Sequence, residues 1–239
     1  MELAPRIHRV GAEIVSSYFV EDGGEVVLVD ASAPANWATL PEALAAIGRS
    51  LDDVRAVLLT HGHDDHIGFA EQARRAGIPA HVHEQDAALA RGEEKNRASY
   101  VGPYRPRPLI SFLLYYARAG LLRVPRIREV VTFGDGATLD VPGSPRVIHV
   151  PGHTLGSAAL HFPGHDALFS GDAINTYAYT SGRTGPQLSP LNRDRAQALE
   201  SLKQIEDVPA THVLPGHGAT WHQGVKSAVI AVRATNPLG

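Results

Sequence analysis

The chain has 239 residues, of which 44% are hydrophobic and 20% are charged, and its formal net charge is −3. This composition is typical of a globular protein with a sizeable core, and the small net charge gives no general attraction to nucleic acid or to anionic membranes. The absence of cysteine excludes disulfide bonds, thiolate metal ligands and a cysteine nucleophile.

The first third of the chain alternates short β-rich runs with turns. Residues 13–20 (EIVSSYFV) and 23–30 (GGEVVLVD) predict a β-hairpin. A helix is predicted over residues 37–47, where leucine and isoleucine recur on one face. Further along, the pattern predicts a buried strand at 54–60 (VRAVLLT), a helix at 67–77 that ends at a glycine, and a short strand at 78–83 (IPAHVH).

Residues 84–128 form an irregular and mainly helical segment, which interrupts the strands. Short strands are then predicted at 129–133, 137–141, 146–150, 157–162 and 166–170, followed by a helix at 193–205, a strand at 211–218 and a helix at 222–233. The strands outnumber the helices, and the helices fall between groups of strands. This order predicts an α+β fold in which two sheets pack face to face with helices outside.

Four of the predicted strands end in the same way, in a turn residue followed by a side chain that can bind a metal. These ends read THGHDDH (60–66), PGHT (151–154), SGD (170–172) and PGHG (215–218). A strand end positions a side chain more rigidly than a free loop does, as a metal site requires. The side chains gathered in this way are imidazoles and carboxylates, a set that suits zinc and also accepts manganese or iron: His61, His63, Asp65, His66, His153, Asp172 and His217.

The order and spacing of these motifs resemble the metallo-β-lactamase superfamily of hydrolases, over nearly the whole chain. THGHDDH is similar to the HxHxDH signature of that family, and the three later strand ends are similar to its later ligand motifs. The resemblance implies a four-layer αββα sandwich, formed by a single domain over 1–239 with a helical insertion at about 84–128. It also implies a metal site at one edge of the two sheets.

By this resemblance two Zn²⁺ ions per chain are expected, with Mn²⁺ or Fe²⁺ as alternatives. His61, His63 and His153 would hold the first ion, Asp65, His66 and His217 the second, and Asp172 would bridge them. Two such ions can share a hydroxide, which is a nucleophile at neutral pH. Asp65 is the best candidate to take a proton from this nucleophile.

Two further aspartates lie close to this set. Asp30 ends the predicted strand at 23–30, where it would either orient a ligand histidine or cap a turn. Asp64 lies inside the HxHxDH motif at its non-ligand position, and we interpret it as a helix cap. In the loop after Asp172, Asn175, Tyr177 or Tyr179 could line the substrate pocket, and Tyr177 is the candidate that we select.

The inserted segment is basic and apolar at the same time. From Lys95 to Arg128 there are eight basic and no acidic residues, and within it residues 109–122 (LISFLLYYARAGLL) predict a helix that is apolar on nearly every side. Such a helix must be covered. We expect it to wall the substrate pocket through Phe112 and Tyr116, or to form a homodimer contact, with a membrane-surface helix or simple packing on the sandwich as the alternatives.

The motifs do not select one substrate. A metal-bound hydroxide acting on a small carbonyl ester, lactone or thioester is favoured, and the insertion suggests an apolar group on that substrate. The alternatives are a mononuclear iron oxygenase resembling persulfide dioxygenases, a phosphodiesterase or nuclease, and a β-lactamase. No nucleic-acid partner and no membrane span are expected, and a cytoplasmic location follows from the lack of a visible signal peptide.

Overall fold

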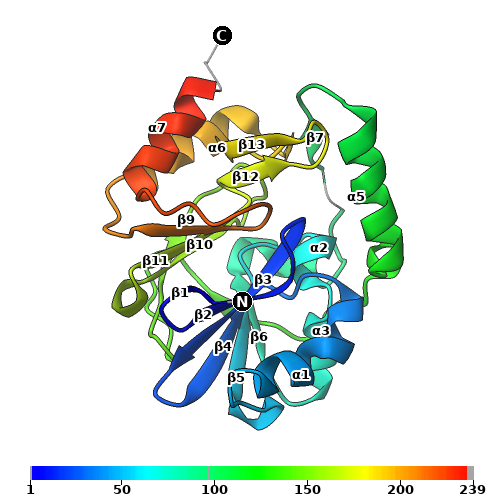
Figure 1. The fold of residues 1–239 in the computed structure, drawn as a ribbon, viewed down its shortest axis with the longest axis vertical. Helices are drawn as coiled ribbons and strands as arrows, with labels where there is room; N and C mark the ends of the chain where they lie inside the picture. The colour runs from blue at the N-terminus through cyan, green and yellow to red at the C-terminus, as the bar shows by residue number, and fades with distance from the viewer. Residues whose placement is uncertain (1, 96, 236–239) are drawn as a thin grey trace.

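Two β-sheets form the centre of the protein in a computed structural model that describes residues 2–95 and 97–235 (Figure 1). The first sheet has seven strands in the order β1-β2-β3-β4-β5-β6-β8. They are β1 (Glu2–Ala4), β2 (Ile7–Ala12), β3 (Val15–Asp22), β4 (Glu25–Val29), β5 (Val54–Leu58), β6 (Ala80–His83) and β8 (Val131–Phe133). The strands up to β4 are antiparallel to their neighbours, whereas β4, β5, β6 and β8 run parallel.

The second sheet has four strands in the order β15-β11-β10-β9. They are β9 (Arg146–His149), β10 (Ala158–Phe162), β11 (Ala167–Gly171) and β15 (His212–Pro215). Since β11 and β15 run parallel, their carboxyl ends meet at one edge of this sheet, with Gly171 paired to Pro215. Two small pairs complete the strands: β12 (Asn175–Ala178) with β13 (Arg183–Gln187), and β7 (Ser99–Tyr100) with β14 (Leu191–Asn192).

Helices cover the outer face of each sheet. The first sheet carries α1 (Leu40–Ala45) and α3 (Ala70–Arg75), and the second carries α6 (Arg195–Ser201) and α7 (Val225–Thr235). The strand β4 is a continuous apolar run in sequence because both of its faces are buried. Val26 and Leu28 pack with the helices, whereas Val27 and Val29 pack between the two sheets, because successive side chains of a strand point to opposite faces. The expected four-layer αββα sandwich is confirmed.

Several local predictions were wrong in their boundaries or type. The helix predicted at 67–77 is split into α2 (Asp64–Ile67) and α3, since the chain at Gly68 passes so close to Ser32 that a Cβ would lie 1.8 Å from its carbonyl oxygen. The helix predicted at 37–47 begins as a 3-10 turn over Pro34–Thr39. Residues 137–141 form no strand but only one isolated bridge, from Thr138 to Arg146.

The insertion lies between β6 and β8 and contains α4 (Ala87–Ala90), β7 and α5 (Pro106–Arg118). The helix α5 runs along one side of the molecule (Figure 1, green). It ends before residue 122, as Gly120 adopts a left-handed conformation with a φ of 83°. Short 3-10 turns occur at Leu51–Asp53, Glu84–Asp86, Leu121–Arg123, Pro163–His165 and Leu202–Gln204. Within the described ranges, no helix is long and apolar enough to span a membrane.

Candidate metal centre

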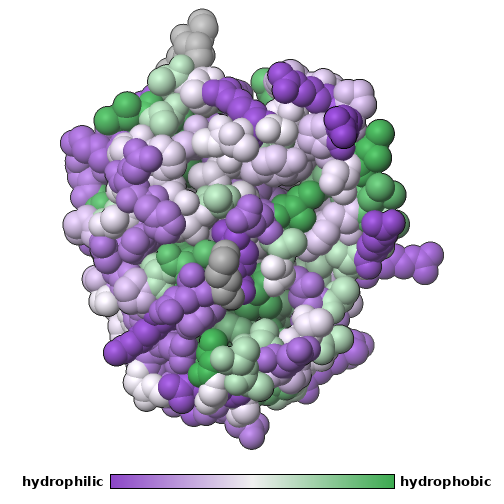
Figure 2. Space-filling view, viewed as in Figure 1, coloured by the Kyte–Doolittle hydropathy of each residue, from purple (hydrophilic) through white to green (hydrophobic). Residues whose placement is uncertain are grey.

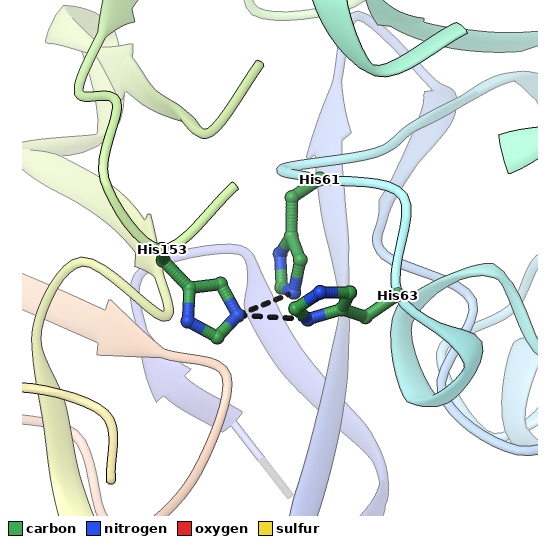
Figure 3. A group of neighbouring side chains, drawn as sticks. All are labelled: His61, His63 and His153. Atoms are coloured by element: carbon green, nitrogen blue, oxygen red, sulfur yellow. Dashed lines mark hydrogen bonds between the residues drawn. The ribbon is translucent and has the colours of Figure 1, made fainter. Parts of the chain in front are cut away.

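Three histidine rings converge where the two sheets meet. His61 and His63 follow β5, and His153 follows β9 in the other sheet (Figure 3). Nε2 of His153 lies 3.1 Å from Nε2 of His61 and 2.9 Å from Nδ1 of His63. The rings of His61 and His153 are buried and nearly perpendicular, at 86°. We refer to these three residues as the three-histidine group.

Hydrogen bonds on the far side of these rings set their orientation. Nδ1 of His153 donates to the carbonyl oxygen of Leu191 at 2.7 Å. Nδ1 of His61 faces the hydroxyl oxygen of Thr60 at 3.1 Å, and this hydroxyl in turn donates to Asp30 at 2.9 Å. Because Nδ1 carries the proton in His61 and His153, Nε2 of each is left with a lone pair, and His63 turns its Nδ1 toward them. Lone pairs that face one another at about 3 Å repel unless a cation lies among them.

A second set of donors adjoins the first, made of Asp65, His66, His217 and Asp172, and we call it the mixed group. Nδ1 of His66 donates to Asp30 at 2.9 Å, and Nδ1 of His217 donates to the carbonyl oxygen of Ile14 at 2.5 Å. Nε2 of His217 is left 3.5 Å from a carboxylate oxygen of Asp65 and from one of Asp172.

Two buried atoms of the mixed group are placed where a cation could bind both. Among the described residues, Nε2 of His66 and Oδ1 of Asp172 are buried without a hydrogen-bond partner, and they lie 3.5 Å apart. Buried polar atoms are rarely left in this state. A metal ion would satisfy both atoms, so the donor set fits the cation that the sequence predicts.

Asp172 lies between the two groups. Its Oδ1 is 3.5 Å from both His66 and His217, and its Oδ2 is 3.4 Å from Nε2 of His153. The hydroxyl of Ser189 donates to Oδ2 at 3.1 Å and fixes the carboxylate. The structure thus brings all seven predicted ligands together, in three overlapping groups whose donor atoms lie within 4.8 Å of one another.

The electrostatics of the site favour a cation. Burial lowers the pKa of His61 well below its usual value, and the neighbouring imidazoles lower it further. Burial alone would lower the pKa of His66 too, but the Asp30 carboxylate raises it to about 10. Burial would raise the pKa of Asp172, yet the surrounding imidazoles hold it well below its usual range. His61 is therefore unprotonated and Asp172 is ionised, which are the forms that bind metals, whereas a metal ion would have to displace a proton from His66.

Glycine is required at a ligand loop for a steric reason. A Cβ on Gly216 would lie 2.5 Å from Oδ1 of Asp172 and 2.6 Å from the ring of His66. Any side chain at this position would displace both groups. This close approach accounts for the glycine of the PGHG motif, one residue before His217.

The structure identifies a carboxylate that the sequence reasoning missed. Asp86 follows β6 and is buried. It accepts hydrogen bonds from the backbone N–H of Gly62 at 2.8 Å, from the hydroxyl of Thr154 at 2.7 Å and from the backbone N–H of Gly156 at 2.7 Å. It therefore joins the two loops that carry the three-histidine group. Its position just beyond a strand parallel to β5 is the signal that could have revealed it.

Asp30 and Asp64 have different surroundings. Asp30 is buried and accepts hydrogen bonds from the ring of His66 and the backbone N–H of Thr60. It therefore contacts the ligand loop, as expected if it orients a ligand histidine. Asp64 does not cap a helix. It lies inside the first turn of α2, whose N-cap is His63, and it forms an ion pair with Arg126 of the insertion at 2.6 Å.

A cavity of about 340 Å³ opens onto the donor atoms. Its lining includes Asp65 and Asp172 on the metal side and Phe112, Tyr116 and Tyr179 on the other. The rings of Phe112 and Tyr179 stack at 4.1 Å. The sequence favoured Tyr177 for this lining, but Tyr177 lies outside it and packs in the cluster beneath α5. The lining also includes the basic residues Lys95 and Arg126 together with the acidic residues Asp64 and Glu94.

Comparisons with known proteins agree with this architecture. The family model described as "Metallo-beta-lactamase superfamily" matches residues 10–217. The probable metallo-hydrolase YybB of Bacillus subtilis is 37% identical over 209 residues, which cover 85% of this chain and 80% of YybB. A hydroxyacylglutathione hydrolase of Fuscovulum blasticum is 32% identical over 151 residues, or 63% of this chain and 44% of that enzyme.

A solved structure aligns along almost the entire length. The crystal structure of TTHA1623 in a di-iron-bound form superposes with a TM-score of 0.64 and 25% sequence identity, covering 97% of this chain and 98% of that protein. With ligand-type side chains at four strand ends, an αββα sandwich that brings them together, and a family match across most of its length, the chain belongs to the metallo-beta-lactamase superfamily.

Proposed function

We propose that this member of a superfamily of metal-dependent hydrolases binds two metal ions, zinc in the first place, and hydrolyses a small carbonyl ester, lactone or thioester. The observation that carries this proposal is the placement of Asp172 between two groups of metal-binding side chains. The proposed ligands are those that the sequence predicts: His61, His63 and His153 for one ion, Asp65, His66 and His217 for the other, and Asp172 for both.

The side chains of the cavity have distinct tasks in this reaction. When bound, the metal ions bring the pKa of a coordinated water toward neutrality and polarise the carbonyl oxygen of the substrate. Asp65 is the only partly exposed member of its ligand group, at 14% of its side chain, and it faces the cavity. We assign to it the acceptance of a proton from the attacking water. Asp30 and Asp86 keep the ligand loops in place without touching the substrate.

The cavity favours a substrate with an apolar or aromatic part. Phe112 and Tyr116 come from α5, and Tyr179 stacks on Phe112. Burial, with the charges of Asp172 and Asp65, holds the pKa of Tyr179 well above its usual value, so its hydroxyl remains a neutral hydrogen-bond donor. A relative named as a hydrolase of an acyl-glutathione supports a thioester as one substrate class. The cavity suits a small molecule better than a nucleic-acid strand.

A second candidate is an iron enzyme. Iron as the metal, although not a single-ion site, is favoured by the structural neighbour in a di-iron-bound form and by a donor set of imidazoles and carboxylates that accepts iron as well as zinc. An oxygenase would use one iron and consume oxygen, whereas a hydrolase needs no oxygen. The two candidates therefore differ in an observable quantity.

Metal analysis followed by a substrate panel tests the proposal. Protein purified without added metal should contain two zinc ions per chain, and it should cleave lactones, esters or thioesters in preference to phosphodiesters and a β-lactam. The Asp172→Ala variant should lose both metals and turnover. The matched control is Asp207→Ala, because this carboxylate is 87% exposed and its one ion pair among the described residues is with Lys226. One iron per chain with oxygen uptake, or an Asp172→Ala variant with two metals and normal turnover, would contradict the assignment.

A further inference from the structure

The exposed large hydrophobic side chains of the described chain are concentrated on α5 and in the segments next to it. Large hydrophobic side chains are exposed at eight described positions, and six of these lie within residues 101–122. The six are Val101, Tyr104, Ile110, Leu113, Leu114 and Leu122, and we call them the outer apolar strip. Leu113 is 55% and Leu122 is 72% exposed, although neither lines the substrate cavity. Figure 2 shows hydrophobic residues along the edge where α5 lies in Figure 1.

The inner side of α5 is already occupied. Phe112, Tyr115 and Tyr116 pack into a cluster that also contains Ala119 and Tyr179. The helix is therefore anchored to the body of the protein by one apolar face while it presents a second one to solvent. A helix with two apolar faces is expected where the outer face meets a further apolar partner.

Four arginines border the outer apolar strip. Arg105 and Arg107 lie at the start of α5, and Arg118 and Arg123 lie at its end. All four are exposed. In the described part of the chain none of them forms an ion pair, in contrast to Arg126, which pairs with Asp64. No acidic residue occurs between Lys95 and Arg128, so the segment that carries the strip supplies no carboxylate of its own to these four arginines.

We propose that the outer apolar strip docks on an anionic lipid bilayer surface, with α5 parallel to the membrane plane. Aliphatic side chains of such a helix enter the boundary between headgroups and acyl chains, and flanking arginines reach the lipid phosphates. A second copy of this chain fits less well. A twofold contact would place the same patch against itself, and the arginines of one copy would face those of the other.

Docking in this position has a consequence for the cavity. Phe112 and Tyr116 line the cavity from the opposite face of the same helix. A docked protein would therefore hold one wall of its cavity next to the lipid surface. The docking itself does not depend on the hydrolase reaction, and it can be tested separately from it.

The test is sedimentation of the full-length, zinc-loaded protein with vesicles. Vesicles of phosphatidylcholine with about 30% phosphatidylserine should bind the protein, whereas pure phosphatidylcholine should bind it much less. Raising the salt from about 0.1 M to about 1 M should release it. Each basic residue at an anionic surface contributes about 1 kcal/mol, so the Arg118→Gln, Arg123→Gln double variant should bind roughly 25-fold more weakly.

A second variant tests the apolar contribution. Leu113→Gln with Leu114→Gln should also abolish most of the binding, while Ile230→Gln, which is equally exposed at 55% but lies on α7, should bind as the wild type does. Hydrolysis of a short soluble ester should be equal in all these proteins, which shows that the fold and the metal site are intact.

Three outcomes would overturn the proposal. The first is a wild-type protein that stays in solution with anionic vesicles, and the second is a leucine variant that still sediments with them. The third is a wild-type protein that sediments as a dimer in the ultracentrifuge while the leucine variant is a monomer, because the strip would then be a contact between two copies.

Discussion

Replacement of Asp86 by asparagine should weaken metal binding at the three-histidine group. The carboxylate of Asp86 receives the backbone N–H of Gly62 on one oxygen and the backbone N–H of Gly156 on the other, at 2.8 Å and 2.7 Å. Asparagine offers only one acceptor oxygen, so one of these N–H groups would face an amide NH₂ instead. The loss of a hydrogen bond to a charged group costs about 1.5–3 kcal/mol.

That free energy should appear in the metal affinity, because the two loops joined by Asp86 carry His61, His63 and His153. We expect binding at this group to be about 10- to 100-fold weaker, as 1.4 kcal/mol corresponds to a factor of ten. The assay is a titration of zinc into metal-free protein in competition with a chromophoric chelator, which resolves the two dissociation constants. Asp52→Asn is the matched control, since Asp52 is exposed and lies before β5, at the end of this strand away from His61.

The melting temperature of the metal-free proteins separates a local effect from unfolding. If the Asp86→Asn variant binds both zinc ions with wild-type affinity, the loops are positioned without Asp86 and the reasoning fails. If both sites weaken equally and the melting temperature falls sharply, Asp86 supports the fold as a whole and does not position the ligands of one ion.

Three further predictions follow from other contacts. In the same titration, the Asp30→Asn variant should bind zinc at the mixed group roughly tenfold more weakly, because His66 loses its carboxylate partner. An unchanged zinc affinity would argue against this role of Asp30. Replacement of Phe112 and Tyr116 by alanine should raise KM for long or aromatic esters far more than for short ones, while metal content stays constant; an equal loss across a chain-length series would show that they only pack. Hydrogen bonds from the neighbouring arginines lower the pKa of the buried Glu71 from 4.5 to about 2, so its ionised form stabilises the folded state above about pH 4.5 and this contribution is lost as the pH falls toward 2. The free energy of unfolding of Glu71→Gln should therefore be lower than that of the wild type by up to about 3 kcal/mol at pH 7 but equal to it near pH 2. Urea unfolding at both pH values measures this difference. A difference in unfolding free energy that is the same at pH 7 and at pH 2 would contradict the reasoning.

The sequence by itself determined the fold family and the set of candidate ligands. Both depend on local patterns: apolar runs that alternate between two buried faces, as in β4, and a turn residue followed by His or Asp at four strand ends. A strand end fixes its last side chain through the backbone of its own segment, so such residues can be recognised before the tertiary structure is known. Their roles as ligands remain predictions, although the structure brings all of them together.

The tertiary structure decided which distant segments meet. Asp86 and Gly156 are 70 positions apart, and no local pattern shows that the carboxylate of one receives the N–H of the other. Similarly, β12 ends at Ala178, so the chain leaves the strand before Tyr179 and places this ring, and not that of Tyr177, against the cavity. The end of α5, by contrast, was a local signal: Gly120 adopts the left-handed conformation that ends helices, although the apolar composition continues beyond it. Contacts between remote loops depend on how the two sheets pack, and that packing is a property of the whole chain.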